Sequence, residues 1–329
     1  MPDGQLLVTG AAGFIGARFV ASCRRLGFPV ISVDRPAFFQ TRMEHRGIDF
    51  GDVVDSEELF EWLDRRRPRL TGIVHLGACT DTTELDRAYL EAVNVRYSEE
   101  LWRIAANRQV PFVYASSAAT YGDGSLGYQD DEATLPLLKP LNPYGQSKQE
   151  VDLWVLEQER ASSHPPSWCG FKFFNVYGFG ERHKGKMASV ALHAFDQIRA
   201  TGRMRLFKSH RPDIPHGHQK RDFIHVDDVV EVLHFALKKP IQRGIFNLGT
   251  GQARSFLDLA GCVFRELGCP EQIEFIDTPI ELQARYQYFT EARMERLRKE
   301  GYTAPFTSLE NGIRTYIRDL VAFARESHP

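Results

Sequence analysis

The segment TGAAGFIG at residues 9–16 is the sequence feature that most limits the possible folds of this chain. It follows a short apolar run at 5–9 and precedes a helix-length amphipathic stretch at about 14–26. Glycines at this TGxxGxxG spacing let a strand turn tightly into a helix and let the backbone approach a phosphate closely. The first N–H groups of the helix then face that phosphate. The segment therefore predicts a strand–turn–helix unit that binds a dinucleotide pyrophosphate.

The same alternation of strands and helices continues through the first half of the chain. Further apolar runs that predict buried strands lie at 29–33, 72–76, 110–115 and 170–174. Amphipathic stretches that predict helices lie between them, at about 55–66, 84–107 and 145–161. Buried strands that alternate with helices predict an α/β fold, a doubly wound parallel sheet with helices on both faces.

The pattern changes after about residue 176, where a helix at 187–201 precedes a polar loop at 208–221. We expect residues 1–175 with about 222–249 to form a Rossmann domain that binds NAD(P). Residues of about 176–221 with 250–329 are expected to form a smaller α/β lobe that binds substrate and is interleaved with the first.

The composition excludes several classes of protein. The formal net charge is only −2, which argues against a nucleic-acid partner. Five cysteines without CxxC spacing argue against a disulfide framework or a zinc site, and favour reduced thiols in the cytoplasm. We find no signal-peptide pattern and no apolar run long enough to span a membrane. We therefore expect a cytoplasmic protein without a membrane partner.

Asp34 ends the second predicted strand, 34 − 16 = 18 residues after the last glycine of the motif. An acid about 20 residues after that glycine binds the adenosine ribose in such folds and favours NAD. The adjacent Arg35 can pair with the 2′-phosphate of NADP. The sequence leaves both cofactors open.

Tyr144 and Lys148 form a YxxxK pattern at the start of a predicted helix, so both side chains lie on one face. A free tyrosine has a pKa of about 10, and a neighbouring ammonium stabilises its phenolate. Ser117 follows the predicted strand at 110–115, at the edge of the sheet where ligands bind. Its hydroxyl is a candidate partner for a substrate hydroxyl or ketone, whereas Ser116 is better explained as a strand-end cap.

Together these motifs resemble the extended short-chain dehydrogenase/reductase family over nearly the whole chain. The segments that carry the resemblance are TGAAGFIG, HLGAC at 75–79, Asn94, SSAATYG at 116–122 and YGQSK at 144–148. The resemblance implies that Ser117, Tyr144 and Lys148 support hydride chemistry. The motif and the resemblance together predict these cofactor contacts: Gly10, Gly13, Phe14, Ile15, Gly16, Asp34, Arg35, Asp52, Val53, Leu76, Gly77, Ala78, Cys79, Thr80, Asn94, Lys148, Val176 and Lys184.

Two further sequence features limit which reaction of the family this chain can catalyse. Sugar-nucleotide dehydratases of this family carry an Asp-Glu pair after the active-site hydroxyl, whereas this chain has Ala118-Ala119-Thr120. Because elimination of water needs an acid there, a dehydratase is disfavoured. Other segments resemble the ADP-glyceromanno-heptose 6-epimerases of the family: HKGKMAS at 183–189, GACTDTTELD at 77–86, GIFNLGTGQARSF at 244–256 and RYQYFT at 285–290.

This resemblance implies an isomerase of lipopolysaccharide-core heptose synthesis. NADP would oxidise the heptose C6 carbinol to a ketone and return hydride to the other face, with no net redox change. It implies Tyr144 and Lys184 as the two acid–base groups, with Lys148 supporting Tyr144. A lysine serves as a base only where burial or a nearby cation lowers its pKa. From spacing alone, Lys184 would be an exposed lysine in a polar loop.

The resemblance also implies a set of substrate contacts, in which Arg221 is suited to the ADP diphosphate. Lys186 departs from the family pattern, which has a small hydroxyl residue there. The loop at 208–221 holds three histidines at irregular spacing without nearby cysteines or acids, so we expect no metal. The predicted substrate contacts are Ser117, Asn175, Lys186, His193, Phe207, Lys208, Ser209, His210, Arg221 and Tyr286.

Two alternatives remain at this point. One is a 4-epimerase of another nucleotide sugar, which would share the motifs up to YGQSK and differ at HKGKMAS. The other is a binding protein that kept the fold and lost catalysis, but the presence of both Tyr144 and Lys148 argues against it. The resemblance further implies a homo-oligomer, typically a pentamer.

Overall fold

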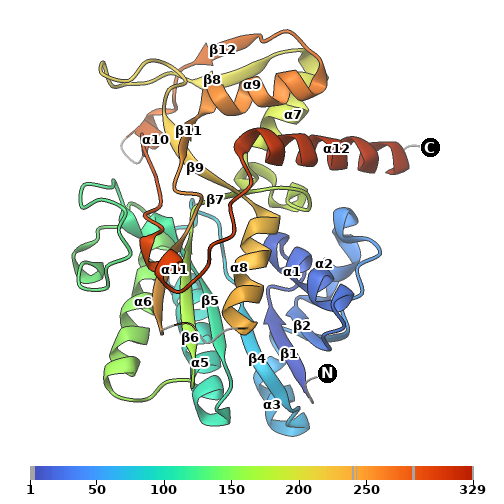
Figure 1. The fold of residues 1–329 in the computed structure, drawn as a ribbon, viewed down its shortest axis with the longest axis vertical. Coiled ribbons are helices and arrows are strands. Elements are labelled where there is room, and N and C mark those ends of the chain that lie inside the picture. The colour runs from blue at the N-terminus through green and yellow to red at the C-terminus, as the bar shows by residue number, and fades with distance from the viewer. Residues whose placement is uncertain (1–3, 239–240, 242, 284–285, 328–329) are drawn as a thin grey trace.

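The computed structural model describes residues 4–238, 241, 243–283 and 286–327, with a seven-stranded parallel sheet at its centre (Figure 1). The strand order is β10-β6-β5-β4-β1-β2-β3. The strands are β1 (Gln5–Thr9), β2 (Val30–Asp34), β3 (Asp52–Asp55), β4 (Leu70–His75), β5 (Phe112–Ser117), β6 (Trp168–Phe173) and β10 (Gly244–Leu248). Every neighbouring pair is parallel, so the predicted doubly wound parallel sheet is confirmed.

Helices cover this sheet because its central strands are apolar on both faces. Helices α1 and α8 pack on each other, whereas α5 packs against β4 and α6 against β5. The helices of this part are α1 (Phe14–Arg25), α2 (Pro36–Thr41), α3 (Leu59–Arg66), α4 (Arg87–Leu90), α5 (Tyr97–Arg108), α6 (Pro143–Arg160), α8 (Val226–Lys238) and α11 (Glu295–Lys299).

The helix expected at 84–107 is not one continuous α-helix. A π-helical turn, η2 (Glu91–Arg96), separates α4 from α5. This wider turn contains Asn94, which is fully buried and exchanges hydrogen bonds with the backbone of Cys79. The interruption therefore coincides with a buried contact to the segment that follows β4, as is common for π-helical turns near functional sites.

A smaller lobe stands beyond one end of the sheet and has its own apolar core (Figure 1). It begins where β6 ends, because only Phe174 separates β6 from β7. One small sheet has the order β11-β9-β7, and β8 pairs with β12. Its elements are β7 (Asn175–Tyr177), α7 (Val190–Thr201), β8 (Met204–Phe207), β9 (Lys220–His225), β11 (Ala253–Ser255), α9 (Phe256–Leu267), β12 (Ile273–Ile276), α10 (Ile280–Gln283) and α12 (Leu309–Ser327).

The chain crosses between the two lobes more than once. Residues 222–249 were expected to return to the Rossmann domain. Within this stretch, α8 packs on α1 and β10 pairs with β6, as expected, whereas β9 pairs within the small sheet of the other lobe. The division into two domains at the stated boundaries remains our proposal. No helix in the described part of the chain combines the length and apolar character that a membrane span requires.

Candidate functional site

A cavity of about 660 Å³ opens between the carboxyl ends of the central strands and the smaller lobe. It brings together most of the residues that the sequence predicted for the site. The predicted residues that line it are Gly10, Gly13, Phe14, Ile15, Gly16, Asp34, Leu76, Gly77, Ala78, Cys79, Thr80, Ser117, Tyr144, Lys148, Asn175, Val176 and Lys184.

The glycine loop has the geometry of a phosphate cradle. Gly10 has a φ of 66°, and a Cβ on it would lie 2.6 Å from the backbone N of Gly77. A Cβ on Gly16 would lie 2.0 Å from the Gly10 carbonyl oxygen. Gly13 precedes α1 and brings no side-chain cap, so the first helical N–H groups have no capping side chain as acceptor. These features fit a dinucleotide pyrophosphate at the start of α1.

Asp34 and Arg42 lie together at the other end of this loop. The Asp34 carboxylate accepts hydrogen bonds from the backbone N of Ala12 (3.0 Å) and of Arg35 (2.9 Å). Burial raises the pKa of Asp34, while the charge of Arg42 opposes that rise. The Arg42 guanidinium donates to the Ala12 carbonyl and stacks over the Phe38 ring, 4.0 Å from its centroid.

Arg42 lines the cavity, whereas Arg35 is exposed and does not. Sequence reasoning chose Arg35 because it adjoins Asp34 and missed Arg42, which lies eight positions after Asp34. Only the course of α2 brings Arg42 back toward the glycine loop.

Tyr144 and Lys148 occupy the first turns of α6 as predicted, on one buried face. Asn142 caps the helix by accepting a hydrogen bond from the backbone N of Gly145 (2.8 Å). Lys148 donates to the Ala115 carbonyl of β5 at 2.9 Å. Burial lowers the pKa of Lys148 to about 8, and the charge of Asp152 opposes that fall.

The pKa of Tyr144 differs from the sequence expectation. Burial raises it above its ordinary value, and the hydrogen bond with Ser117 opposes this rise. The Lys148 ammonium, one helical turn further on, donates to the Ala115 carbonyl. Ser117 is therefore a side chain whose hydrogen bond favours the Tyr144 phenolate.

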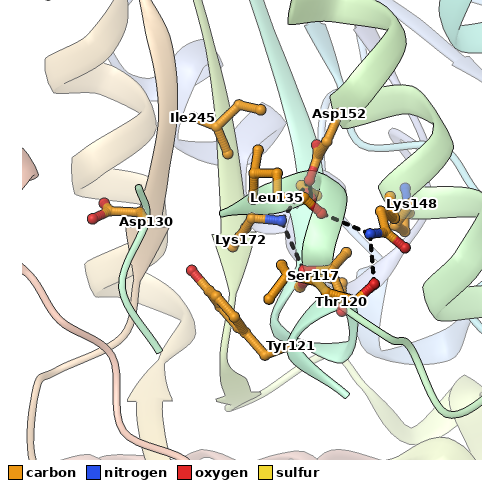
Figure 2. A network of polar contacts seen from close by, with 12 residues as sticks. Ser117, Thr120, Tyr121, Asp130, Leu135, Lys148, Asp152, Lys172 and Ile245 are labelled. Carbon is orange, nitrogen blue, oxygen red and sulfur yellow. Dashed lines mark hydrogen bonds and ion pairs between the residues drawn. The ribbon is translucent and has the colours of Figure 1, made fainter. Parts of the chain in front are cut away.

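A fully buried ion pair lies behind these residues (Figure 2). Lys172 Nζ on β6 is 2.5 Å from Asp152 Oδ2, one helical turn after Lys148 on α6. The same ammonium donates to Thr120 Oγ1 at 2.7 Å, and the Thr120 hydroxyl donates to the Ser117 carbonyl at 2.8 Å. The pair thus connects α6 and β6 to the turn that follows Ser117 at the end of β5.

The hydroxyls of β5 complete the partners of Asp152. Ser116 donates to Oδ2 at 2.7 Å, and Tyr114 donates to Oδ1 at 2.9 Å. The interpretation of Ser116 as a strand-end hydroxyl with a structural partner is consistent with this contact, although Ser116 also lines the cavity.

Lys184 reaches the cavity from the short helix η5 (Arg182–Met187) that follows β7. Its ammonium lies 5.5 Å from the centroid of the Phe14 ring, which belongs to the glycine motif. Burial lowers the pKa of Lys184, and the charge of Glu181 opposes that fall. Lys184 is half-buried, so it is not the freely exposed lysine that spacing alone suggested.

Several predicted site residues do not line the cavity. Asn94 lies behind its wall, bound to Cys79 and to the Ser147 hydroxyl (2.9 Å). Asp52 and Val53 lie exposed on β3. The full set outside the cavity is Arg35, Asp52, Val53, Asn94, Lys186, His193, Phe207, Lys208, Ser209, His210, Arg221 and Tyr286.

Arg221 is buried and already has partners within the protein. Its guanidinium lies 5.4 Å from the Phe256 ring centroid and 5.7 Å from that of Tyr286. It donates to the carbonyls of Lys220 (2.8 Å) and Gln287. These contacts fix Arg221 beside the segment 286–290.

Two cavity residues of that segment, Gln287 and Thr290, were missed as site residues, although the motif at 285–290 contains both. Arg285 of this motif lies outside the described residues. The Gln287 amide donates to the Gly122 carbonyl at 2.5 Å, which connects the segment to the loop after β5. The remaining missed lining residues are Phe38, Arg42, Asp81, Thr82, Ala115, Ser116, Ala118, Ala119, Phe173, Phe174, His183 and Met187.

The polar loop expected at 208–221 ends before Lys220, where β9 begins, and it contacts β12 and the residues that follow β12. Lys208 pairs with Asp277 at 2.9 Å, and His216 Nδ1 accepts from the backbone N of Ser209 at 3.0 Å. The backbone N of His210 donates to the Tyr288 hydroxyl at 3.0 Å. Across the described ranges, no three His, Cys, Asp or Glu side chains form a group that could bind a metal.

Comparison with known proteins agrees with this geometry. The profile of the NAD dependent epimerase/dehydratase family matches residues 6–249. The ADP-L-glycero-D-manno-heptose-6-epimerase of Fusobacterium nucleatum is 40% identical over 97% of this chain and 98% of its own length. The enzyme of the same name from Nitratidesulfovibrio vulgaris is 43% identical over the same shares.

Solved structures give the same result. The crystal structure of Helicobacter pylori ADP-L-glycero-D-manno-heptose-6-epimerase is 27% identical, covers 97% of each chain and has a TM-score of 0.79. MoeE5 in complex with UDP-glucuronic acid and NAD is 26% identical, covers 98% of this chain and all of its own, and has a TM-score of 0.75. The chain belongs to the NAD-dependent epimerase/dehydratase family and, within it, to the branch that contains the ADP-L-glycero-D-manno-heptose-6-epimerases.

Proposed function

We propose that this protein inverts C6 of the heptose in ADP-D-glycero-β-D-manno-heptose to give ADP-L-glycero-β-D-manno-heptose. The relatives named above support the substrate. The observation that carries the chemistry is that Tyr144 and Lys184 line one cavity with the glycine loop. A nicotinamide dinucleotide bound at that loop would take a hydride from C6 and return it to the opposite face.

Tyr144 is proposed as one acid–base group. Its phenolate takes the proton of the C6 hydroxyl of one epimer and becomes the neutral hydroxyl, and Ser117 hydrogen-bonds the same substrate oxygen. Ser117 favours the phenolate through its hydrogen bond to Tyr144. Lys148 supports Tyr144 from one turn further along α6, where the Ala115 carbonyl holds its ammonium.

Lys184 is proposed as the second acid–base group. The two epimers place the C6 hydroxyl at different positions relative to a fixed cofactor, so one base cannot serve both. Lys184 comes from the smaller lobe, whereas Tyr144 comes from α6. Partial burial brings its pKa down toward the range in which an amine exchanges protons.

NADP is the proposed cofactor. Both Asp34 oxygens already accept backbone hydrogen bonds, and the Arg42 guanidinium lines the cavity beside Asp34. A cation at that place suits the 2′-phosphate of NADP and offsets the charge of the acid. Under this proposal Arg42 takes the role that the sequence assigned to Arg35.

The substrate contacts expected from the sequence stay proposals, with Asn175 the member that lines the cavity beside Lys184. We also propose a cytoplasmic homo-oligomer, a pentamer by resemblance to the family.

The direct test is to incubate the purified protein with ADP-D-glycero-β-D-manno-heptose, first without added cofactor. The ratio of C6 epimers is followed by NMR. Conversion to a mixture supports the activity and shows that cofactor remains bound through the cycle. Conversion that requires added NADP or NAD identifies the preferred cofactor. If folded, cofactor-loaded protein does not convert the substrate, the heptose assignment is wrong and another nucleotide sugar, tested at C4, becomes the leading candidate.

A further inference from the structure

Glu181 is a fully buried carboxylate immediately before the turn that carries Lys184. Its Oε2 accepts from the backbone N of Ser189 at 2.6 Å. Its Oε1 accepts from the Ser189 hydroxyl at 2.6 Å and from the Tyr316 hydroxyl at 3.0 Å. The backbone N of Gly178 adds a longer bond of 3.3 Å. One side chain therefore connects the end of β7, the start of α7 and the middle of α12.

The backbone of Glu181 also shapes the turn. Its carbonyl accepts the backbone N of Lys184 at 2.9 Å, which closes the first turn of η5. Ser189, which the carboxylate holds, is the N-cap of α7 and accepts from the backbone N of Leu192. The segment that carries Lys184 is thus fixed at both ends through Glu181.

The charge of Glu181 has no cation in contact with it among the described residues, although a buried carboxylate normally has one. The two neighbouring acids, Asp196 and Glu44, do have a cation beside them. Arg182 pairs with Asp196 at 2.9 Å and lies 3.8 Å from Glu44. Glu181 is therefore the acid whose charge remains to act on Lys184.

We propose that Glu181 is a positioning residue for Lys184, which holds the turn that carries the amine and supplies the buried negative charge that acts on it. This inference rests on the role of Lys184 in the proposed function. It adds a residue that touches neither substrate nor cofactor.

The balance of effects on Lys184 agrees with this role. Burial lowers its pKa, and Glu181 is the charged group that opposes the fall. Without Glu181 the amine would lose its proton at lower pH. The other titratable or charged groups around this turn are Arg42, Glu44 and His45 from the segment after α2, Arg182 and His183 from η5, Asp196 from α7 and Tyr316 from α12.

Glu181→Gln removes the charge and retains the shape. The Ser189 and Tyr316 hydroxyls can rotate from donor to acceptor beside the amide NH2, and the amide oxygen can still accept from the backbone N of Ser189, so only the longer bond from Gly178 is lost. Tyr316→Phe is the matched control, because it removes one hydrogen bond to Glu181 and leaves the charge. A purely structural role predicts similar effects of the two variants, whereas an electrostatic role separates them.

The measurement is the titration of Lys184 in the cofactor-loaded protein. Reductive ¹³C-methylation keeps lysines cationic, and the Lys184 signal is identified by its absence in Lys184→Met. We expect Lys184 to titrate at lower pH in Glu181→Gln and at the wild-type pH in Tyr316→Phe. An unchanged titration in folded Glu181→Gln, or an equal shift in both variants, would overturn the proposal.

Glu181→Asp keeps the charge and provides a second test should the glutamine variant not fold. We expect Lys184 to titrate close to its wild-type pH in this variant. If Lys184 titrates at clearly lower pH in this variant, although the charge is retained, the charge of Glu181 does not control the titration of Lys184. That result would contradict the electrostatic part of the proposal.

The titration also separates this inference from the proposed function. If Lys184→Met epimerises normally, Lys184 is not a base and the two-base mechanism fails, whatever its titration shows. If Lys184→Met is inactive while Glu181→Gln leaves the titration unchanged, the mechanism stands and only the role of Glu181 fails.

Discussion

Lys172 Nζ lies 2.5 Å from Asp152 Oδ2, and neither side chain is exposed to solvent. A buried ion pair contributes little net stability compared with a well-packed apolar pair, but loss of one partner leaves the other charge buried and uncompensated. The pair lies between α6, which carries Tyr144 and Lys148, and the loop after β5 (Figure 2). Its integrity is therefore a condition for the geometry of the site.

Lys172→Met is expected to lower the free energy of unfolding by about 3–5 kcal/mol, because Asp152 loses its contact cation inside the protein. Urea denaturation followed by circular dichroism gives this value. Lys172→Arg retains a cation and is the control, with a smaller expected loss. A loss below about 1 kcal/mol in Lys172→Met would show that the buried charge finds another partner.

Tyr144→Phe is expected to reduce kcat for epimerisation by about 10²–10⁴-fold, since the variant keeps the ring and loses the group that exchanges the proton. Turnover is followed by NMR of the epimer ratio, and circular dichroism checks the fold. The wild-type rate in a folded Tyr144→Phe variant would remove Tyr144 from the acid–base role.

Lys184→Met is expected to impair conversion in both directions, because each direction uses both acid–base groups in turn. The rate is measured from either pure epimer. Lys184→Arg keeps the cation and loses the amine that can act as a base, and it provides the comparison. A rate restored in Lys184→Arg would attribute the loss to the charge at this position instead of to a base at Lys184.

Arg42→Ala is expected to weaken NADP binding about tenfold or more and to change NAD binding little, because a hydrogen bond to a charged group contributes about 1.5–3 kcal/mol. Calorimetric titration of cofactor-free protein with each cofactor measures both constants. Arg35→Ala is the control and is expected to have the smaller effect. If Arg35→Ala has the larger effect on NADP, the assignment of the 2′-phosphate to Arg42 is wrong.

The lowered pKa of Lys148 predicts that the free energy of unfolding depends on pH. Its pKa falls from an ordinary 10.5 to about 8 in the folded protein, since burial disfavours the charged form. Between these values the unfolded chain binds a proton that the folded chain does not, so stability rises with pH from about 8 to 10.5. The difference in unfolding free energy between wild type and Lys148→Met should therefore change in favour of wild type across this range. Curves that stay parallel would contradict the lowered pKa.

Local sequence patterns were sufficient to predict the glycine loop and the Tyr144–Lys148 pair of the site. The glycine positions follow from sterics within one turn, since a Cβ on Gly16 would overlap Gly10. Tyr144 and Lys148 share a face because helical spacing places them there. Both predictions depend on residues close in sequence, and the structure places these residues as expected.

The remaining contacts of the site come from residues that are distant in sequence from these motifs. Arg42 approaches the glycine loop from 30 residues away in sequence, and Tyr316 reaches Glu181 across 135 positions. Lys172 meets Asp152 only because β6 pairs with β5 beneath α6. A periodic pattern specifies which face of an element is buried, but not which element lies opposite. The sequence by itself therefore determined the dinucleotide-binding fold and the YxxxK pair, whereas tertiary packing decided which charges surround Asp34, Lys148 and Lys184.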